Sequence, residues 1–197
     1  MLRSRLVAGL AVLALLGTIA GCGGDTGESL GAANTLTLGG YVTVDAYHYD
    51  EATGTYVQFY HDEGSNVITT IGLNFIENHL GIGGAGNDDA ATWISLSNDA
   101  SADAGWTQLA GEPATNDNGL GRLFGNYSTT GGDGVWQISE TFNVIADGGT
   151  VQTTGLQWLA GLQSNNNLLA VKNFAQVTLV NGDSLTVTWT ITLTQTP

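Results

Sequence analysis

The last part of the chain restricts its fold more than any other stretch. The run 168–180 leads into Asn181-Gly182, and the run 183–193 follows directly. Asn-Gly between two apolar runs is the strongest short-range signal for a β-hairpin. The second run alternates strictly, with Leu, Val, Trp and Ile at one set of positions and mostly threonine at the other. This period of two predicts an antiparallel strand with an apolar inner face and a threonine outer face.

Further segments of strand composition precede this hairpin. The run 36–49 alternates in part, 50–54 has turn chemistry and 55–60 is rich in aromatic residues, which together predict a first hairpin followed by a polar break at 61–65. Further strands are expected at 92–96, 119–129, 135–145 and 151–158. Short strands separated by Gly- and Asn-rich turns predict a mainly β fold, an antiparallel β-sandwich or jelly-roll-like domain.

One segment, Asn66 to Leu80, has the apolar spacing of a short helix. Thr69 or Thr70 is the expected N-cap. Gly72 lies inside the helix, where it is unfavourable by about 1 kcal/mol relative to Ala, so we expect it to permit close approach to a strand. A helix this short depends on packing its apolar stripe, which predicts that it joins the first hairpin to the later strands.

The start of the chain has the features of an export signal. Two arginines precede an apolar run from Leu6 to Leu16, which is too short to span a membrane. Ile19-Ala-Gly-Cys22 then resembles the lipobox of bacterial and archaeal lipoproteins, and this resemblance implies lipidation of Cys22, the single cysteine. Gly23 rather than Asp follows, which by the same resemblance permits sorting to an outer membrane. We therefore expect an exported protein, anchored at the outer membrane or cell surface.

These features divide the chain into three parts. Residues 1–21 are the predicted lipoprotein signal peptide, 22–34 a flexible tether rich in Gly and small residues, and 35–197 a single β-sandwich domain. Two acyl chains on Cys22 suffice for stable anchoring. The membrane is therefore a predicted partner, and the lipid on Cys22 makes the attachment.

The charge of the chain excludes some partners. Four basic and 18 acidic residues give a formal charge of −14. Loss of Arg3 and Arg5 with the signal leaves Arg122 and Lys172 against the same 18 acids, a charge of −16. Nucleic-acid binding needs Lys and Arg to neutralise phosphates, so DNA and RNA are discarded as partners. Solubility or a saline habitat explains the acidity.

Cofactor candidates are few. His48, His61 and His79 have no metal-binding spacing. Asp99, Ser101 and Asp103 have the i, i+2, i+4 spacing of calcium loops, although no glutamate closes the loop, and polar loop composition is the alternative explanation. We predict no cofactor, with calcium at this loop as the alternative.

The tryptophans suggest an alternative function. Trp93 and Trp106 fall outside the apolar strand patterns, so they are candidates for stacking on sugar rings, as in a carbohydrate-binding module. Filling of the core or of an interface is the competing interpretation.

Catalytic motifs are absent from the sequence: it contains no G-x-S-x-G, P-loop, CxxC or HExxH. Glu140 falls on the apolar side of a strand pattern, where burial would raise its pKa and make it a candidate acid for a carboxylate-dependent hydrolase. A bulge that turns Glu140 outward is the preferred alternative, and the chain is predicted not to be an enzyme.

Several short motifs in the mature chain are similar to those of small β-rich virion and tail-fibre-like proteins of tailed bacterial and archaeal viruses. The matching segments are 66–72, 92–96, 109–112, 119–122, 141–142, 154–156 and 181–192. The resemblance implies structural assembly rather than catalysis, while the lipobox departs from it and favours a cellular surface protein. We therefore expect a structural, adhesive or assembly role, with self-association or a surface glycan or protein as partner.

Overall fold

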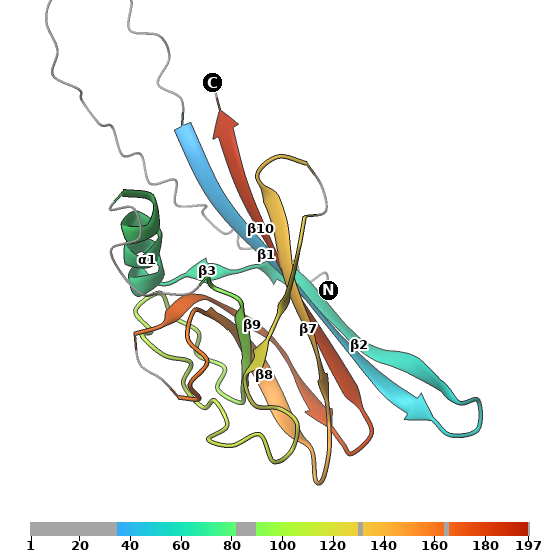
Figure 1. Ribbon diagram of the computed structural model, residues 1–197. Coiled ribbons are helices and arrows are strands. Elements are labelled where there is room, and N and C mark those ends of the chain that lie inside the picture. Colours follow the sequence, from blue (N-terminus) through green and yellow to red (C-terminus); the bar gives the residue numbers. More distant parts are fainter. Residues whose placement is uncertain (1–34, 82–89, 130–131, 164–165, 197) are drawn as a thin grey trace, which may run out of the picture. The chain divides into compact units, whose positions relative to one another are not determined.

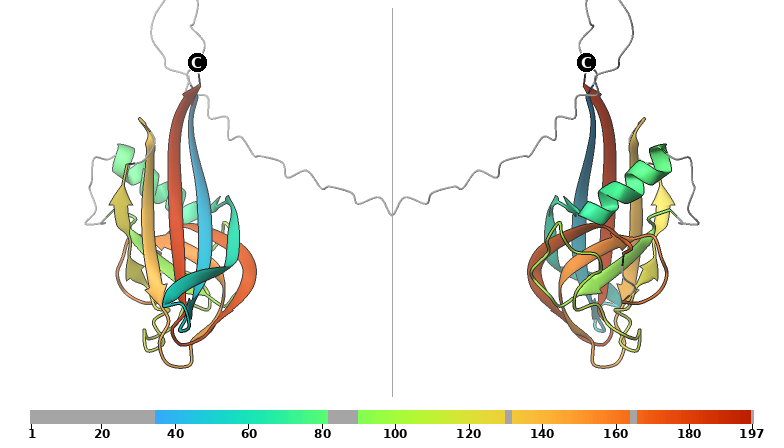
Figure 2. Two further views of the ribbon diagram at one scale, coloured as in Figure 1. Left: turned by 90° about the vertical axis from the view of Figure 1, so that its right-hand side faces the viewer. Right: turned by 90° about the vertical axis from the view of Figure 1, so that its left-hand side faces the viewer.

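The computed structural model describes residues 35–81, 90–129, 132–163 and 166–196. These residues form two antiparallel five-stranded sheets and one short helix, which confirms the predicted β-sandwich (Figures 1 and 2). The predicted signal peptide, the tether and Cys22 lie outside the described residues. No helix in the described ranges is long and apolar enough to cross a membrane.

The first sheet, sheet A, has the strand order β2-β1-β10-β7-β6. Its strands are β1 (Thr35–Asp50), β2 (Thr55–Ser65), β6 (Asn126–Ser128), β7 (Val135–Asn143) and β10 (Ser184–Thr196). β1 and β10 are paired from Thr35 opposite Thr196 to Tyr47 opposite Ser184, so the two ends of the described chain are neighbouring strands. The predicted polar break at 61–65 is wrong, because these residues continue β2 and pair with β1.

The second sheet, sheet B, has the strand order β3-β9-β8-β4-β5. Its strands are β3 (Val67–Ile68), β4 (Trp93–Ser97), β5 (Leu123–Phe124), β8 (Gly149–Gln157) and β9 (Leu168–Leu179). The predicted Asn-Gly turn is present, but the β-hairpin predicted around it is wrong, because its two strands do not pair: β9 belongs to sheet B and β10 to sheet A. Gly182 has φ 91°, which suits the third position of a type II turn.

The core lies between the two sheets and follows the predicted alternation. In β1 and β10, Val42, Val44, Leu185, Val187 and Trp189 are almost fully buried. Ile94, Leu96 and Leu156 of sheet B pack against them. The opposite face of β10 carries the threonines, whose hydroxyls bond across to β7: Thr186 to Thr141 at 2.9 Å and Thr188 to Ser139 at 2.8 Å. The alternation of the sequence therefore predicts correctly which side chains of β1 and β10 face the core and which face outward.

Two positions carry the chain from one sheet to the other. Asn66 lies between β2 and β3, and its amide N–H donates to the carbonyl of Gly40 at 3.2 Å. Gly125 lies between β5 and β6, where a Cβ would come within 2.5 Å of Ile138 Cγ2. The single strand predicted at 119–129 is thus wrong, because close packing at Gly125 divides it into β5 of sheet B and β6 of sheet A.

Helix α1 (Thr70–Gly81) begins later than predicted, because Val67 and Ile68 pair with β9 as β3. Thr69 is the N-cap: its hydroxyl accepts the amide N–H of Gly72 at 2.9 Å. A Cβ on Gly72 would lie 2.1 Å from the carbonyl oxygen of Leu169, which confirms that this glycine permits close approach to a strand. The ring of Phe75 stacks on Trp158 of the β8–β9 connection, with centroids 4.4 Å apart.

The loop segment 98–122, here called the loop layer, packs on β9 of sheet B through Leu109 and Trp106, which contact Leu168 and Val171. Within it, Arg122 and Glu112 form a bidentate ion pair whose two side chains are completely buried, with nitrogen–oxygen distances of 2.8 and 2.7 Å. Arg122 Nη1 also donates to the carbonyl of Leu159, and the amide of Gln163 donates to Glu112. One ion pair therefore fastens the long 98–122 segment to the β8–β9 connection.

Candidate contact surface on the β1–β2 hairpin

The turn of the first hairpin is held by its own side chains. The Asp50 carboxylate accepts hydrogen bonds from the amide of Ala52 and from the Thr53 hydroxyl, each at 2.9 Å. These two bonds hold the pKa of Asp50 below its usual value. Gly54 closes the turn with φ 68°. The hairpin is therefore a fixed element rather than a loose loop.

A β-bulge interrupts the hairpin at Phe59. Ala46 is opposite Tyr60 and Tyr47 is opposite Gln58, so Phe59 has no partner on β1. A bulge of this kind bends its strand and increases the local twist. Figure 1 shows the outer part of the hairpin extending away from sheet B, and residues 55–59 of β2 are all exposed.

Four large side chains are exposed on this part of the hairpin: Tyr49, Tyr56, Val57 and Phe59, here called the hairpin patch. The Tyr49 and Tyr56 rings pack edge to face with centroids 5.2 Å apart. Val57, on the other side of the strand, is 52% exposed. β2 is also the edge of sheet A, since no described strand pairs with its outer side. An edge strand presents free N–H and C=O groups that can add a further strand.

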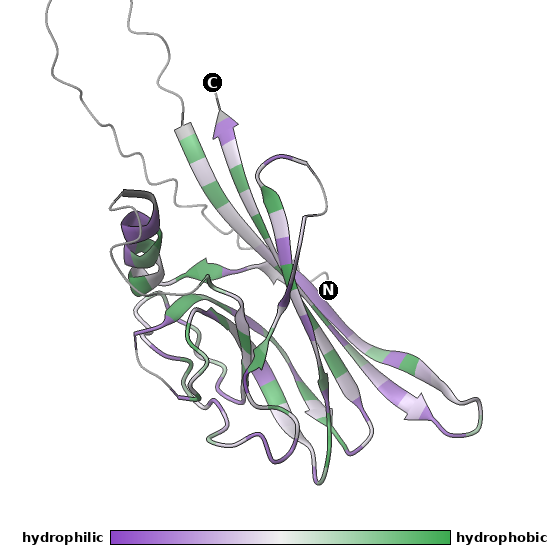
Figure 3. Ribbon diagram, viewed as in Figure 1, coloured by the Kyte–Doolittle hydropathy of each residue, from purple (hydrophilic) through white to green (hydrophobic). Residues whose placement is uncertain are grey.

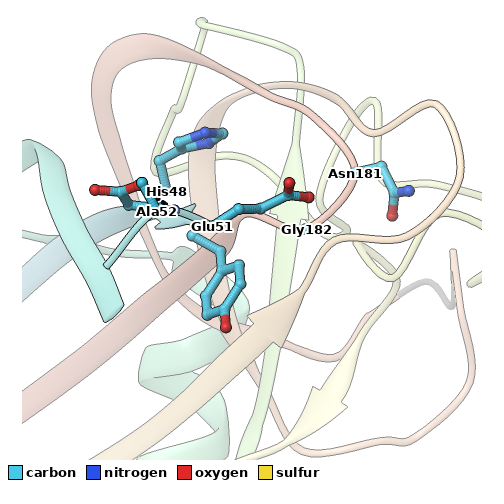
Figure 4. Close-up of a pocket in the computed structure, with 7 residues that line it drawn as sticks. His48, Glu51, Ala52, Asn181 and Gly182 are labelled. Atoms are coloured by element: carbon cyan, nitrogen blue, oxygen red, sulfur yellow. Dashed lines mark hydrogen bonds between the residues drawn. The ribbon is translucent and has the colours of Figure 1, made fainter. Parts of the chain in front are cut away.

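A hollow of about 420 Å³ lies between the hairpin and the β9–β10 turn. It is lined by His48, Tyr49, Asp50, Glu51, Ala52, Asn181 and Gly182, and Figure 4 shows Glu51 extending toward the turn that carries Asn181. His48 Nδ1 lies 2.6 Å from Oδ1 of Asp183, which is buried and accepts the amide of Val180 through its other oxygen. The buried carboxylate therefore orients an exposed imidazole. His48, Asp50, Glu51 and Asn181 bring hydrogen-bond donors and acceptors to this hollow, so it can bind a polar ligand.

Charged groups gather on the outer face of β1 and β2. His61 Nδ1 lies 2.6 Å from Asp45 Oδ1, and its Nε2 lies 3.8 Å from Glu63. The hydrogen bond to Asp45 raises the pKa of His61 above its usual value, and the nearby carboxylates add to this effect.

Burial, reinforced by the charge of Asp62, raises the pKa of Tyr60 to about 12. The Tyr60 hydroxyl donates to the carbonyl of Ala175 at 2.6 Å, which ties β2 to β9.

The two candidate sugar-stacking residues are both half-buried. Trp93 begins β4, and its ring packs edge-on against Phe124 with centroids 5.3 Å apart. Trp106 packs on the small cluster of Leu109, Leu168 and Val171 in the loop layer. Sugar stacking by either residue stays a prediction.

The predicted calcium loop uses its oxygens locally. Asp99 Oδ1 accepts the amide of Ser101 at 2.9 Å and its hydroxyl at 2.6 Å, which lowers the pKa of Asp99. Asp103 Oδ1 accepts the amide of Gly105. Among the residues that the structure describes, no group of three or more His, Cys, Asp or Glu is placed to hold a metal. Calcium binding here stays a prediction.

Glu140 is on the inner side of sheet A, opposite Val187, as its sequence position predicted. The expected bulge is wrong, because β7 and β10 pair without a break around it. Glu140 remains partly exposed, and its Oε2 accepts a hydrogen bond from Asn126 Nδ2 at 3.0 Å. This hydrogen bond joins β6 to β7, and a catalytic role for Glu140 stays a prediction.

The hairpin patch was missed by the reading of the sequence. Tyr56-Val-Gln-Phe-Tyr60 has strand composition, and strand composition by itself predicts burial. Its distinguishing signal is the lack of alternation, since large side chains occur on both faces of a two-sided exposed strand.

Comparisons with protein-family models, curated proteins and solved structures found no match for this chain.

Proposed function

We propose that this protein is an exported, lipid-anchored surface protein whose acidic β-sandwich has a structural or adhesive role. The hairpin patch makes the contact, either with further copies of the chain or with another surface. The observation that carries the proposal is an edge strand that combines free backbone groups with exposed Tyr, Val and Phe side chains. Aromatic residues of this kind dominate the energetics of protein contacts.

The lipobox supports the anchored location in this proposal. Cys22 would carry the lipid, and the tether at 23–34 would join it to the sandwich. Mass spectrometry of the N-terminal peptide from a membrane fraction tests this point, and an unmodified Cys22 or an uncleaved signal would contradict it.

Light scattering of the mature chain tests the self-associating form of the contact. We expect the mass to rise with concentration for the wild type and to stay monomeric for Val57→Lys, which places a charge in the patch. Leu73→Lys is the matched control, because Leu73 is similarly exposed (49%) but lies on helix α1. A wild type that is monomeric at every concentration would remove this form of the proposal.

Carbohydrate binding is the second candidate, and the hollow in Figure 4 favours it. Tyr49 supplies an apolar ring, while His48, Glu51 and Asn181 supply polar groups for sugar hydroxyls. Glycan-array binding that is lost in Tyr49→Ala but kept in Trp93→Ala would support a site at the hollow. Loss in Trp93→Ala alone would place the sugar at the predicted tryptophans.

A further inference from the structure

The end of sheet A that carries both chain termini continues the core face beyond sheet B. In Figures 1 and 2 the first residues of β1 and the last residues of β10 extend past the other sheet. Residues directly opposite each other share a face, so Leu38 and Leu193 are on the same side as Val42 and Trp189. The apolar core face therefore runs on into this projecting end.

The apolar side chains on this face become exposed toward the tip. Val42 and Trp189 are completely buried, Leu38, Leu193 and Trp136 are half-buried, and Leu36 is 60% exposed. Tyr127, on β6 opposite Ile138, is 62% exposed and lines a surface hollow together with Trp136. We call Leu36, Leu38, Tyr127, Trp136 and Leu193 the terminal strip. Green apolar bands cross the projecting ends of the strands in Figure 3.

The terminal strip is almost free of charge in a strongly acidic protein. The runs 35–44 and 184–196 contain no Asp, Glu, Lys or Arg, and Asp133 is the one acid in the stretch 126–139 of the neighbouring strands. The opposite end of the sandwich has acids in its turns: Asp50, Glu51, Asp117, Asp147 and Asp183. The two ends of the described domain therefore differ sharply in charge.

We infer that the terminal strip lies against the lipid surface. Exposed Leu together with Tyr and Trp suits the interfacial layer of a bilayer, where amphipathic rings bury one end and keep the other wet. An uncharged end can approach lipid at little desolvation cost, while the acidic turns are repelled from anionic headgroups.

The position of the strip in the chain also favours a lipid partner, and this step rests on the proposed lipidation of Cys22. Twelve residues, 23–34, separate Cys22 from the first residue of β1. A flexible Gly-rich segment of that length has an end-to-end distance of roughly 20 Å. A tether of this length would let the terminal strip reach the membrane, and the hairpin patch is at the opposite end of β1 from the tether.

Depth-dependent fluorescence tests the inference without relying on lipidation in the cell. The mature chain carries a histidine tag in place of Cys22 and is held on phosphatidylcholine vesicles that contain a nickel-chelating lipid. Leu36→Cys then supplies the only thiol for an environment-sensitive dye. The matched control is Thr37→Cys, on the opposite face of the same strand, and Ala52→Cys reports on the hairpin turn.

We expect a blue shift and quenching by brominated lipid for the dye at 36, weaker quenching at 37 and none at 52. Equal quenching at 36 and 52 would overturn the inference. A blue shift at 36 that depends on protein concentration but not on brominated lipid would also overturn it, because a second copy would then cover the strip. An unmodified Cys22 in the cell would contradict the proposed anchoring alone and leave this result unchanged.

Discussion

At the scale of single residues, the buried pair Arg122–Glu112 is the most consequential contact. Neither side chain is exposed, and each also hydrogen-bonds to the β8–β9 connection, Arg122 to the carbonyl of Leu159 and Glu112 to the amide of Gln163. Arg122→Met leaves a buried, unpaired carboxylate, so we expect it to lower the free energy of unfolding by about 3–5 kcal/mol. Urea denaturation measures the change.

The double variant Arg122→Met with Glu112→Gln is the control for this prediction. It removes both charges, and we expect it to recover part of the lost stability. A single variant as stable as the wild type would show that the pair does not hold the loop layer.

Gly72 gives a prediction in which packing opposes helix propensity. Alanine is favoured over glycine in a helix by about 1 kcal/mol, but a Cβ here would lie 2.1 Å from the Leu169 carbonyl oxygen. We expect Gly72→Ala to be destabilising by about 1–3 kcal/mol, as for other overpacked sites. Asn74→Ala, at an exposed position of the same helix, should be neutral or slightly stabilising in the same thermal or urea titration. Equal stabilisation by both variants would contradict the close approach.

The raised pKa of Tyr60 predicts that the folded protein loses stability at alkaline pH. Its folded pKa, about 12, is higher than the unfolded value near 10, so its contribution is complete below about pH 10 and is lost as the pH rises toward 12. Tyr60→Phe should remove this loss while costing about 0.5–1.5 kcal/mol at neutral pH through the hydrogen bond to Ala175. Urea titrations of both proteins at about pH 8 and about pH 11 make the comparison. Identical pH dependence in the two would contradict it.

Single residues also show what sequence reasoning can and cannot reach. Gly72 and the alternation of β10 were predictable, because each follows from local geometry. The Arg122–Glu112 pair was not, because it joins residues from an irregular loop to the carbonyl of Leu159, far along the chain. The exposure of Val57 and Phe59 was missed for a related reason: it depends on where sheet B ends, which no local pattern records.

At the scale of elements, the two faces of β10 predict opposite responses to nearly the same change. Thr188 is on the outer face and Val187 is completely buried. Val187→Thr places an unsatisfied hydroxyl in the core and should cost about 1–3 kcal/mol. Thr188→Val loses one hydroxyl contact with Ser139 and should change stability by about 0.5 kcal/mol or less. Similar losses for both variants would contradict the assignment of faces.

The sequence predicted most strands but not their distribution between sheets. The Asn181-Gly182 turn was clear, yet its strands belong to different sheets. The crossings at Asn66 and Gly125 are equally hidden, since Asn66 begins the stretch expected to be a helix and Gly125 falls inside the strand expected at 119–129. Periodicity identifies which face of a strand is buried, whereas the partner of that face is chosen by packing over the whole domain.

At the scale of the whole molecule, the acidic surface predicts that salt stabilises the fold. With four basic residues against 18 acidic ones, like charges repel one another in the folded state. Screening shortens the range of this repulsion from about 10 Å at 0.1 M to about 3 Å at 1 M salt. We expect the free energy of unfolding in urea to rise as NaCl is added. A fall with added NaCl would contradict this account of the charge.

The proposed function depends most on the hairpin patch as the outward contact surface. Binding of the dye-labelled mature chain to cells that display the full-length protein measures this contact whether the partner is a second copy or another surface molecule. We predict that the wild type and Leu73→Lys bind equally, and that Val57→Lys loses binding although its stability is unchanged. Binding of Val57→Lys at the wild-type level, or no binding by the wild type, would contradict the proposal.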